Sequence, residues 1–308
     1  MFAEFKEIPF YEQWIKIEKV NYGWSSDEKY YIEDLNGRKL LLRVNSIHNY
    51  ESKKKEFEII QKYNKLDFPM SEVVSFGMCN QNQNVYMLLT WVEGESLENI
   101  IQSLDEKEQY QLGIQAGKIL KSIHTLPVEK QDYPKETKRA KKLLQLEKYE
   151  NSKYRIPEDE EIIRFVRDRI QDICRLEPAY EHGDFHIGNL IYMKDNTIGV
   201  IDFNRWECGD PYEEFYKMQS FDIEKSIPFA AGQIHGYFQG EPDKEFWQAQ
   251  AVYVAHASLF SIVWASQFDQ SDIDGMTERC MAALQDYNNF KKIIPDWYEK
   301  YELGNDNK

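Results

Sequence analysis

The sequence has few cysteines, a deficit of basic residues and no long apolar run. Its four cysteines lie far apart and form no CxxC pair: Cys79, Cys174, Cys208 and Cys280. This spacing argues against a disulfide framework and against a cysteine-rich zinc site, and it predicts a reducing compartment, the cytoplasm. The chain does not open on a basic stretch followed by an apolar one, so we expect no signal peptide.

The most apolar window, residues 251–265, is only 15 residues long and contains His256. A helix that spans a bilayer needs about 20 predominantly apolar residues. The window therefore predicts a buried helix of a globular protein, and we expect no membrane partner.

Positive charge is scarce, because 38 Lys and Arg residues stand against 53 Asp and Glu residues and give a net charge of −15. A protein that neutralises a phosphate backbone carries the opposite balance, so no nucleic-acid partner is expected. The acidic balance suits a cationic partner. Apolar and charged fractions of 42% and 30% predict a soluble globular chain, and 308 residues allow two domains or lobes.

The first ninety residues are predicted to be rich in β-strand. Short apolar or alternating runs bounded by turn residues predict strands at 14–21, 29–33, 39–45, 73–76 and 85–90. Asn36-Gly37, between the second and third runs, is a strong signal for a hairpin turn. Residues 51–63 have helical periodicity, with Phe57, Ile60 and Tyr63 on one side.

From Leu104 onward the pattern is mainly helical. Asp105 is expected to cap a helix, with Glu108 three residues later, and Pro127 ends it. A second helix is expected at 160–176, a hairpin from 189–193 and 198–203, and mostly helix from 210 to about 301. We therefore predict an α+β chain with a small β-rich lobe at 1–90, a hinge at 91–98 and a larger helical lobe at 99–308.

The stretch H-G-D-F-H-I-G-N at 182–189 carries the clearest chemistry. Asp184 lies five residues before Asn189, and Asp202 follows Asn189 by thirteen residues at the end of a predicted strand. Phosphoryl transfer needs one carboxylate at the acceptor hydroxyl and oxygen ligands that hold Mg²⁺ against the nucleotide phosphates. These three side chains supply those groups. The alternative for Asp184 and Asn189 is a turn or a cap.

The H-G-D form at 182–184, followed by I-D-F at 201–203 and G-D-P at 209–211, resembles the aminoglycoside phosphotransferase family. The resemblance implies a bilobal protein-kinase-like fold with the active site between the lobes. It implies transfer of the γ-phosphate of ATP, or of GTP, to a hydroxyl of a small molecule. Asp184 would orient that hydroxyl and accept its proton, and Asn189 and Asp202 would hold Mg²⁺.

The same resemblance assigns the phosphate-binding cation upstream. Strand alternation places Leu41 and Arg43 on one face of the strand at 39–45. Arg43 then stands where the family has a lysine, and Glu56 on the next helix is the expected pairing acid. Lys39 is the second choice for this cation. The alternative for Arg43 and Glu56 is an ordinary surface ion pair.

The rest of the nucleotide site follows from the resemblance as well. Ser25 and Ser26, in the turn between the first two strands, would close over the phosphates. The Thr90 carbonyl and the Val92 amide would bond the edge of the base. Leu41 and Ile191 would pack on its two faces.

Three residues near Asp184 are given weaker roles. His182 is expected to brace the backbone of the catalytic loop. His186 occupies the position where many kinases place a lysine against the transferred phosphate, so it would contact that phosphate or simply pack. Asp210 is expected to accept hydrogen bonds that hold the catalytic loop.

The C-terminal part is acidic, as a site for a polycationic aminosugar would be. The predicted acceptor-binding carboxylates are Glu207, Glu213, Asp269, Asp272 and Asp274. The alternative for each is a solvated acidic surface.

We therefore expect an O-phosphotransferase, monomeric or dimeric, whose acceptor is a cationic aminoglycoside-type antibiotic. A metabolic kinase acting on choline, homoserine, a thio-sugar or a macrolide is the alternative. A protein kinase is disfavoured because no A-P-E segment follows residues 201–203. A nucleotide-binding pseudoenzyme is disfavoured by the intact Asp184, Asn189 and Asp202.

Overall fold

A computed structural model of the chain describes residues 3–21 and 26–305. The chain divides into two compact units. The first comprises Met1–Ser96 and Asn189–Trp206, and the second Leu97–Gly188 and Glu207–Lys308. The predicted boundaries at 90 and 98 run along the sequence, whereas this division places the segment Asn189–Trp206 with the N-terminal residues. None of the described helices combines the length and the apolar composition needed to cross a membrane.

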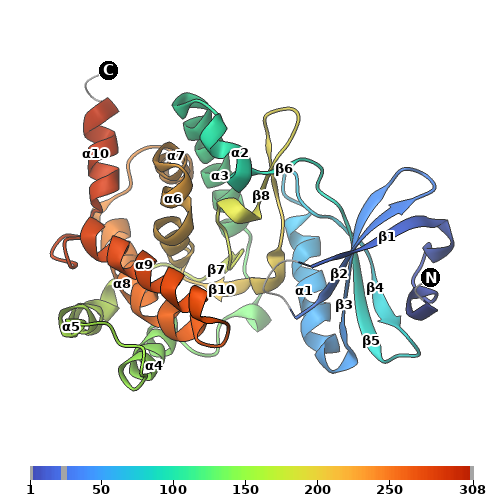
Figure 1. The fold of residues 1–308 in the computed structure, drawn as a ribbon, viewed down its shortest axis with the longest axis horizontal. Coiled ribbons are helices and arrows are strands. Elements are labelled where there is room, and N and C mark those ends of the chain that lie inside the picture. The colour runs from blue at the N-terminus through green and yellow to red at the C-terminus, as the bar shows by residue number, and fades with distance from the viewer. Residues whose placement is uncertain (1–2, 22–25, 306–308) are drawn as a thin grey trace. The chain divides into compact units, whose positions relative to one another are not determined.

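The first unit is built on an antiparallel sheet with the strand order β1-β2-β3-β5-β4 (Figure 1). Its strands are β1 (Trp14–Val20), β2 (Glu28–Asp34), β3 (Lys39–Ser46), β4 (Val73–Cys79) and β5 (Asn84–Thr90). All five were predicted, each within three residues of these bounds. The predicted turn between β2 and β3 is confirmed: Gly37 has a φ of 77°, and the Asp34 carboxylate accepts the amides of Asn36 and Arg38 at 2.9 Å.

The two faces of this sheet differ in character. On one face Tyr30, Ile32 and Leu42 are buried in an apolar core with Phe5 and Ile8 from the N-terminal segment. Burial of this apolar area stabilises the sheet. Because side chains alternate along a strand, the residues between them project from the opposite face. There Lys29 of β2 pairs in register with Arg43 of β3, and Arg43 with Met87 of β5.

Helix α1 (Tyr50–Tyr63) packs against β4 and β5 (Figure 1). Its buried side chains Glu56, Ile59, Ile60 and Tyr63 recur at helical spacing. It begins one residue before the predicted start. Glu56 is the single acid on this buried side of the helix, which faces the sheet.

The segment that returns to the first unit forms a small sheet with the order β6-β8-β9: β6 (Glu95–Ser96), β8 (Leu190–Tyr192) and β9 (Ile198–Val200). Gly94 has a φ of 155°, and a Cβ there would lie 2.2 Å from the carbonyl oxygen of Tyr192. Only glycine therefore permits this approach of the two chain segments. The hairpin strands are shorter than predicted. The second ends at Val200, and Asp202 beyond it has a left-handed backbone with a φ of 64°.

The second unit is mainly helical (Figure 1). Its described helices are α2 (Leu97–Ile100), α3 (Glu106–His124), α4 (Lys138–Glu150), α5 (Glu160–Arg169), α6 (Ile223–Lys225), α7 (Ile227–Phe238), α8 (Lys244–Ala265), α9 (Gln270–Asp286) and α10 (Asp296–Asn305). A short antiparallel pair joins β7 (Ala179–Glu181) to β10 (Glu207–Gly209).

Two helix predictions in this unit are confirmed and one is wrong in length. Asp105 and Glu108 form a reciprocal capping box at the start of α3. The apolar window 251–265 lies in the buried helix α8. Helix α5 was expected to reach residue 176 but ends at Arg169, where a short 3₁₀ turn, Ile170–Asp172, follows. That turn buries Ile170, so apolar burial continues past the end of the helix.

Helices α3 and α7 approach each other through glycines. Gly113 and Gly117 lie one turn apart on α3, and Gly232 and Gly236 one turn apart on α7. A Cβ on Gly113 would lie 2.1 Å from the Phe229 carbonyl oxygen, and one on Gly236 would lie 2.2 Å from that of Ile114. The two backbones are therefore in direct contact.

Candidate active site

In the first unit, Arg43 belongs to a buried cluster of four charged side chains. The Arg43 side chain is 4% exposed, and its guanidinium donates to Asp27 (Nε to Oδ2, 2.7 Å) and to Glu56. Lys53 donates to both carboxylates, at 2.9 Å to Asp27 and 3.0 Å to Glu56. The predicted ion pair between Arg43 and Glu56 is thus present, and it is buried.

The charges of this cluster stabilise one another. Burial by itself would lower the pKa of the Arg43 guanidinium, but the Glu56 and Asp27 carboxylates outweigh it and raise that pKa. Burial by itself would raise the pKa of Asp27, but Arg43 and Lys53 lower it to about 2. Arg43 and Asp27 therefore carry opposite charges side by side in a buried environment.

Two further lysines of the sheet, Lys29 and Lys39, are relevant to the predicted phosphate site. Lys29 places its Nζ 3.4 Å from Oδ2 of Asp202, with the two side chains 13% and 24% exposed. Sequence patterns gave no signal for this contact, because the two residues are 173 positions apart. Lys39, the second choice for the phosphate-binding cation, instead pairs with Glu93, and both side chains are exposed.

The β8–β9 hairpin brings Asn189 and Asp202 to the same end. Leu190 pairs with Val200, and the Ile201 amide donates to the Asn189 carbonyl oxygen at 3.1 Å. Asn189 therefore directly precedes one strand, and Asp202 follows the other by two residues. An amide oxygen and a carboxylate are hard oxygen donors of the kind Mg²⁺ prefers, so this pair fits a magnesium site.

The predicted base-binding residues also lie in the first unit. Thr90 ends β5, Leu41 lies in β3 opposite Leu89, and Ile191 lies in β8 opposite Gly199. The Val92 side chain packs closely against Gly199. Ser26 accepts a hydrogen bond from the Asn45 side chain at 3.3 Å, and Ser25 lies outside the described residues.

In the second unit, Asp184 lies beside a lysine that the sequence analysis missed. The Lys217 ammonium donates to Oδ1 of Asp184, and the two side chains are 8% and 15% exposed. His186 places Nε2 3.7 Å from the same oxygen. Burial lowers the pKa of His186 to about 4, so the ring is neutral near pH 7 and the cation beside Asp184 is Lys217. Its distance of 33 residues from Asp184 explains why no motif revealed it.

Two buried carboxylates hold the backbone of the loop at 182–189. Glu214 accepts the amides of His182 and Gly183 at 2.6 and 2.8 Å. Asp222 accepts the amide of Ile187 at 2.8 Å. The buried His182 ring accepts the Asp184 amide at 3.2 Å, in keeping with its expected bracing role.

The expectation for Asp210 was wrong. Its carboxylate accepts hydrogen bonds from the Cys174 amide at 2.6 Å and from the Tyr253 hydroxyl at 2.7 Å. It also accepts the Tyr212 amide at 3.1 Å. The acids that hold the loop are instead Glu214 and Asp222, four and twelve residues further along.

Glu213 and Glu207 both pair with lysines, and they share one of them, the buried Lys138. Glu213 lies 2.6 Å from both Lys138 and Lys142 and is buried. These two lysines offset the burial of Glu213 and hold its pKa far below the usual range. Glu207 is 43% exposed at its side chain and pairs with Lys138 and Lys141. The negative charge of Glu213 is thus offset by two lysines of the fold.

The other three predicted acceptor acids lie in and before the first turn of α9. Asp269 is the N-cap residue of α9 and forms a reciprocal capping box with Asp272. Asp274 accepts a hydrogen bond from the Gln270 side chain at 2.7 Å. The D-x-x-D spacing is a capping signal of the type recognised at Asp105, and it was missed here.

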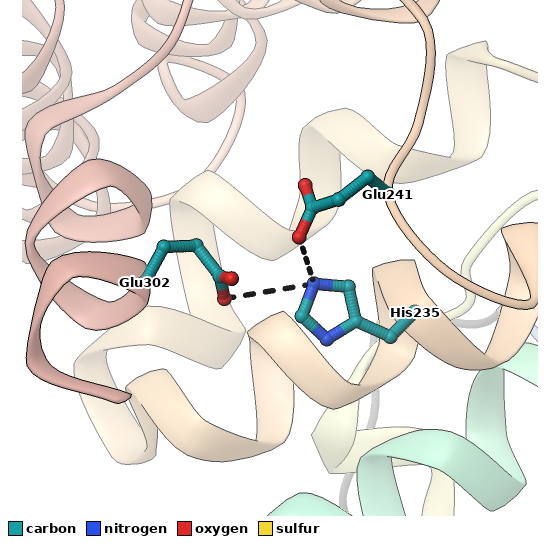
Figure 2. Close-up of side chains that lie close together, drawn as sticks. All are labelled: His235, Glu241 and Glu302. Carbon is teal, nitrogen blue, oxygen red and sulfur yellow. Dashed lines mark ion pairs between the residues drawn. The ribbon is translucent and has the colours of Figure 1, made fainter. Parts of the chain in front are cut away.

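A separate cluster joins α7 to α10 (Figure 2). Nε2 of His235 lies 3.3 Å from Glu241 and 3.6 Å from Glu302. The hydroxyls of Tyr110 and Tyr298 lie 3.0 and 2.9 Å from the two ring nitrogens. Burial lowers the pKa of His235, so these hydroxyls supply hydrogen bonds that a neutral ring can make. The cluster therefore attaches the last described helix to α7.

The model of the phosphotransferase enzyme family matches residues 16–248, about three quarters of the chain. The chain belongs to this family. Family membership supports a phosphotransferase activity and agrees with the resemblance seen in the sequence motifs. No curated protein matches the sequence.

Solved aminoglycoside phosphotransferases have the same fold. The GDP complex of wild-type aminoglycoside 2′-phosphotransferase-IIIa aligns with a TM-score of 0.70 at 17% identity, over 91% of this chain and 95% of that one. The gentamicin complex of APH(2″)-IIa gives 0.66 at 18% identity, over 91% and 94%. A thermostable mutant of APH(4)-Ia with ADP and hygromycin B gives 0.68 at 16% identity, over 92% and 98%. The predicted α+β, kinase-like fold class is confirmed.

Proposed function

We propose that this phosphotransferase-family protein transfers the γ-phosphate of ATP, or of GTP, to a hydroxyl group of a small molecule. The observation that carries the proposal is the arrangement at residues 182–202. Asp184 is held in a loop braced by buried carboxylates, and the hairpin that follows brings Asn189 and Asp202 together. Structural relatives that bind GDP or ADP support a nucleotide as the phosphate donor.

Asp184 would orient the acceptor hydroxyl and accept its proton as the oxygen attacks the γ-phosphate. Lys217, which already contacts Asp184, would keep a positive charge beside the reacting groups. Asn189 and Asp202 would hold Mg²⁺, which neutralises charge on the phosphate oxygens. The neutral His186 would pack beside Asp184 and supply no charge.

The base would be bound by the backbone of Thr90 and Val92 and packed by Leu41 and Ile191. Such contacts use main-chain groups and apolar surface, so they suit either purine nucleotide. Ser25 and Ser26 would close over the phosphates.

We propose an aminoglycoside-type acceptor. The net charge of −15 favours a cation, and the relatives include complexes with kanamycin and gentamicin. A second candidate is a less charged metabolic hydroxyl compound. It is favoured by the engagement of Glu213 with two lysines and of Asp269 with a helix cap, which leaves fewer carboxylates for a polycation.

The test is release of ADP or GDP in the presence of Mg²⁺ and either nucleotide, across aminoglycosides, macrolides, choline and homoserine. Replacing Asp184 by Asn should lower kcat by about 10²–10⁴-fold, the usual contribution of a general base, and leave nucleotide affinity unchanged. Replacing Asp202 by Asn should abolish the Mg²⁺-dependent increase in nucleotide affinity.

The matched control is Asp195→Asn. Asp195 is an exposed acid in the turn of the same hairpin, and among the described residues its carboxylate bonds to Thr197. The Asp195→Asn variant should have the same turnover rate as the unmodified enzyme. Full activity of Asp184→Asn would refute the proposed role of Asp184.

A further inference from the structure

We propose that Lys29, and not Arg43, is the cation that binds the phosphates of the nucleotide. This inference rests on the proposed function. Lys29 and Arg43 are direct cross-strand partners on β2 and β3, so both project from the same face of the sheet. The register thus places two cations side by side. Their surroundings indicate which one is available to the phosphates.

Arg43 is already committed to a closed cluster. Three of its guanidinium nitrogens donate to Asp27 and Glu56, and its side chain is 4% exposed. Lys53 completes the cluster with two positive and two negative charges, which balance. If Arg43 turned to a phosphate, the two buried carboxylates would have to share Lys53, and removing one partner from a buried ion-pair cluster is strongly destabilising.

Lys29 has a different environment. Its Nζ lies 3.4 Å from Oδ2 of Asp202, and both side chains retain some exposure. That distance is longer than a normal hydrogen bond between an ammonium and a carboxylate, so little is lost when the pair separates. Asp202 is also the residue proposed to hold Mg²⁺. When Asp202 turns to a cation that arrives with the nucleotide, the Lys29 ammonium gains the phosphate oxygens as partners.

Lys39, the second choice from the sequence, does not compete. Lys39 pairs with Glu93 at the exposed end of β3. An ammonium on a flexible stem can move from Asp202 to a phosphate, whereas the planar guanidinium of Arg43 is fixed by a fork of hydrogen bonds. Arg43 therefore acts as a positioning residue that holds Asp27 at the start of β2 and Glu56 on α1.

The test measures equilibrium binding to the full-length chain, with no acceptor present. The probes are a fluorescent methylanthraniloyl ATP and its GTP counterpart, with Mg²⁺, and adenosine or guanosine as the phosphate-free ligand. Lys29→Met should weaken triphosphate binding by about 10- to 100-fold, the range of a charge-assisted hydrogen bond. It should leave nucleoside binding and the thermal midpoint near those of the unmodified chain.

Two comparison variants sharpen the result. Lys19→Met removes an exposed lysine of β1, which pairs with Glu28, and should leave triphosphate affinity unchanged. Arg43→Lys should lower the thermal midpoint, because it breaks the fork, yet keep triphosphate affinity within about threefold. Lys29→Met decides the inference by itself, so a poorly folded Arg43→Lys chain would not obscure it.

The outcomes separate the two proposals. If the unmodified chain binds neither triphosphate, the proposed function fails and this inference with it. If the unmodified chain binds a triphosphate and Lys29→Met binds it equally well, only the assignment of Lys29 is overturned. A folded Arg43→Lys chain that loses triphosphate affinity and retains nucleoside affinity would return the role to Arg43.

Discussion

Asp222 is a fully buried acid that accepts the Ile187 amide through one oxygen. Its other oxygen, Oδ2, is buried with no hydrogen-bond partner in the described part of the chain. Burial raises the pKa of Asp222 to about 7, and the nearby Glu98 carboxylate acts in the same direction. The loop at 182–189 is therefore held in part by an acid that is partly protonated near neutral pH.

Replacing Asp222 by Asn should make stability less dependent on pH. The folded pKa of Asp222 is raised above its unfolded value of about 4, so the unmodified chain loses stability as pH rises from about 4 to 7. The Asn side chain does not titrate and avoids this loss. Relative to the unmodified chain, the variant should gain about 2–4 kcal/mol between pH 4.5 and pH 8, measured by urea unfolding. A difference that stays constant across this range would contradict a raised pKa.

The sequence predicts site residues in the loop at 182–189 and in the hairpin after it, because a fixed spacing relates them. Asp184, Asn189 and Asp202 lie within nineteen positions of one another, and the chemistry of phosphoryl transfer selects those residue types. Lys29 and Lys217 were missed because tertiary packing, and not spacing, brings them to Asp202 and Asp184. Single-sequence patterns hold no record of such contacts.

The contact of α3 with α7 depends on residue size. Gly236 faces the Ile114 carbonyl oxygen, which is backbone and has no rotamer through which to move away. Gly275, in the middle of α9, faces only the end of the Arg279 side chain at 3.4 Å. Two helical glycines thus offer a matched comparison.

Gly236→Ala should destabilise the protein by about 1–3 kcal/mol, because overpacking forces the two helices apart. Gly275→Ala should leave stability unchanged or raise it by up to about 1 kcal/mol, the helix preference of alanine over glycine. Chemical unfolding of both variants checks this pair of outcomes. Equal effects of the two substitutions would show that helix propensity, and not close contact, governs Gly236.

Helix and strand positions were largely predictable, and the misses have physical causes. Alternation and turn signals located β1 to β5, and the capping residue Asp105 located α3. The same capping logic applies at Asp269, but its carboxylate was assigned to an acceptor because the region is acidic. The end of α5 at Arg169 was not predicted, because apolar residues continue into the 3₁₀ turn.

Taken as a whole, the chain is not two consecutive domains. The segment Asn189–Trp206 belongs to the first unit, where β8 pairs with β6, Val200 bridges Met70, and Phe203 packs on Tyr63 at 5.4 Å between ring centroids. Residues 1–96 alone therefore lack part of their own structure.

A fragment of residues 1–96 should melt at a lower temperature and less cooperatively than the same fragment joined to residues 189–206. Because Ser96 pairs with Ile191, a short Gly/Ser linker suffices to connect them. Circular dichroism of both fragments during heating provides the measurement. Identical transitions would mean that the returning segment adds nothing to the stability of the first unit.

The first unit is formed from two separate parts of the chain, so it can be completed only after the second part has been synthesised. Domains generally fold from the N-terminus as the chain emerges from the ribosome, at about 5–20 residues per second. The β1–β5 sheet emerges early, but β8, β9 and Phe203 follow only after roughly one hundred further residues, a delay of about 5–20 s. During that interval the nascent sheet leaves Tyr63 without the ring that covers it in the finished protein. The ribosome thus releases α3 to α5 of the second unit before the first unit can be completed.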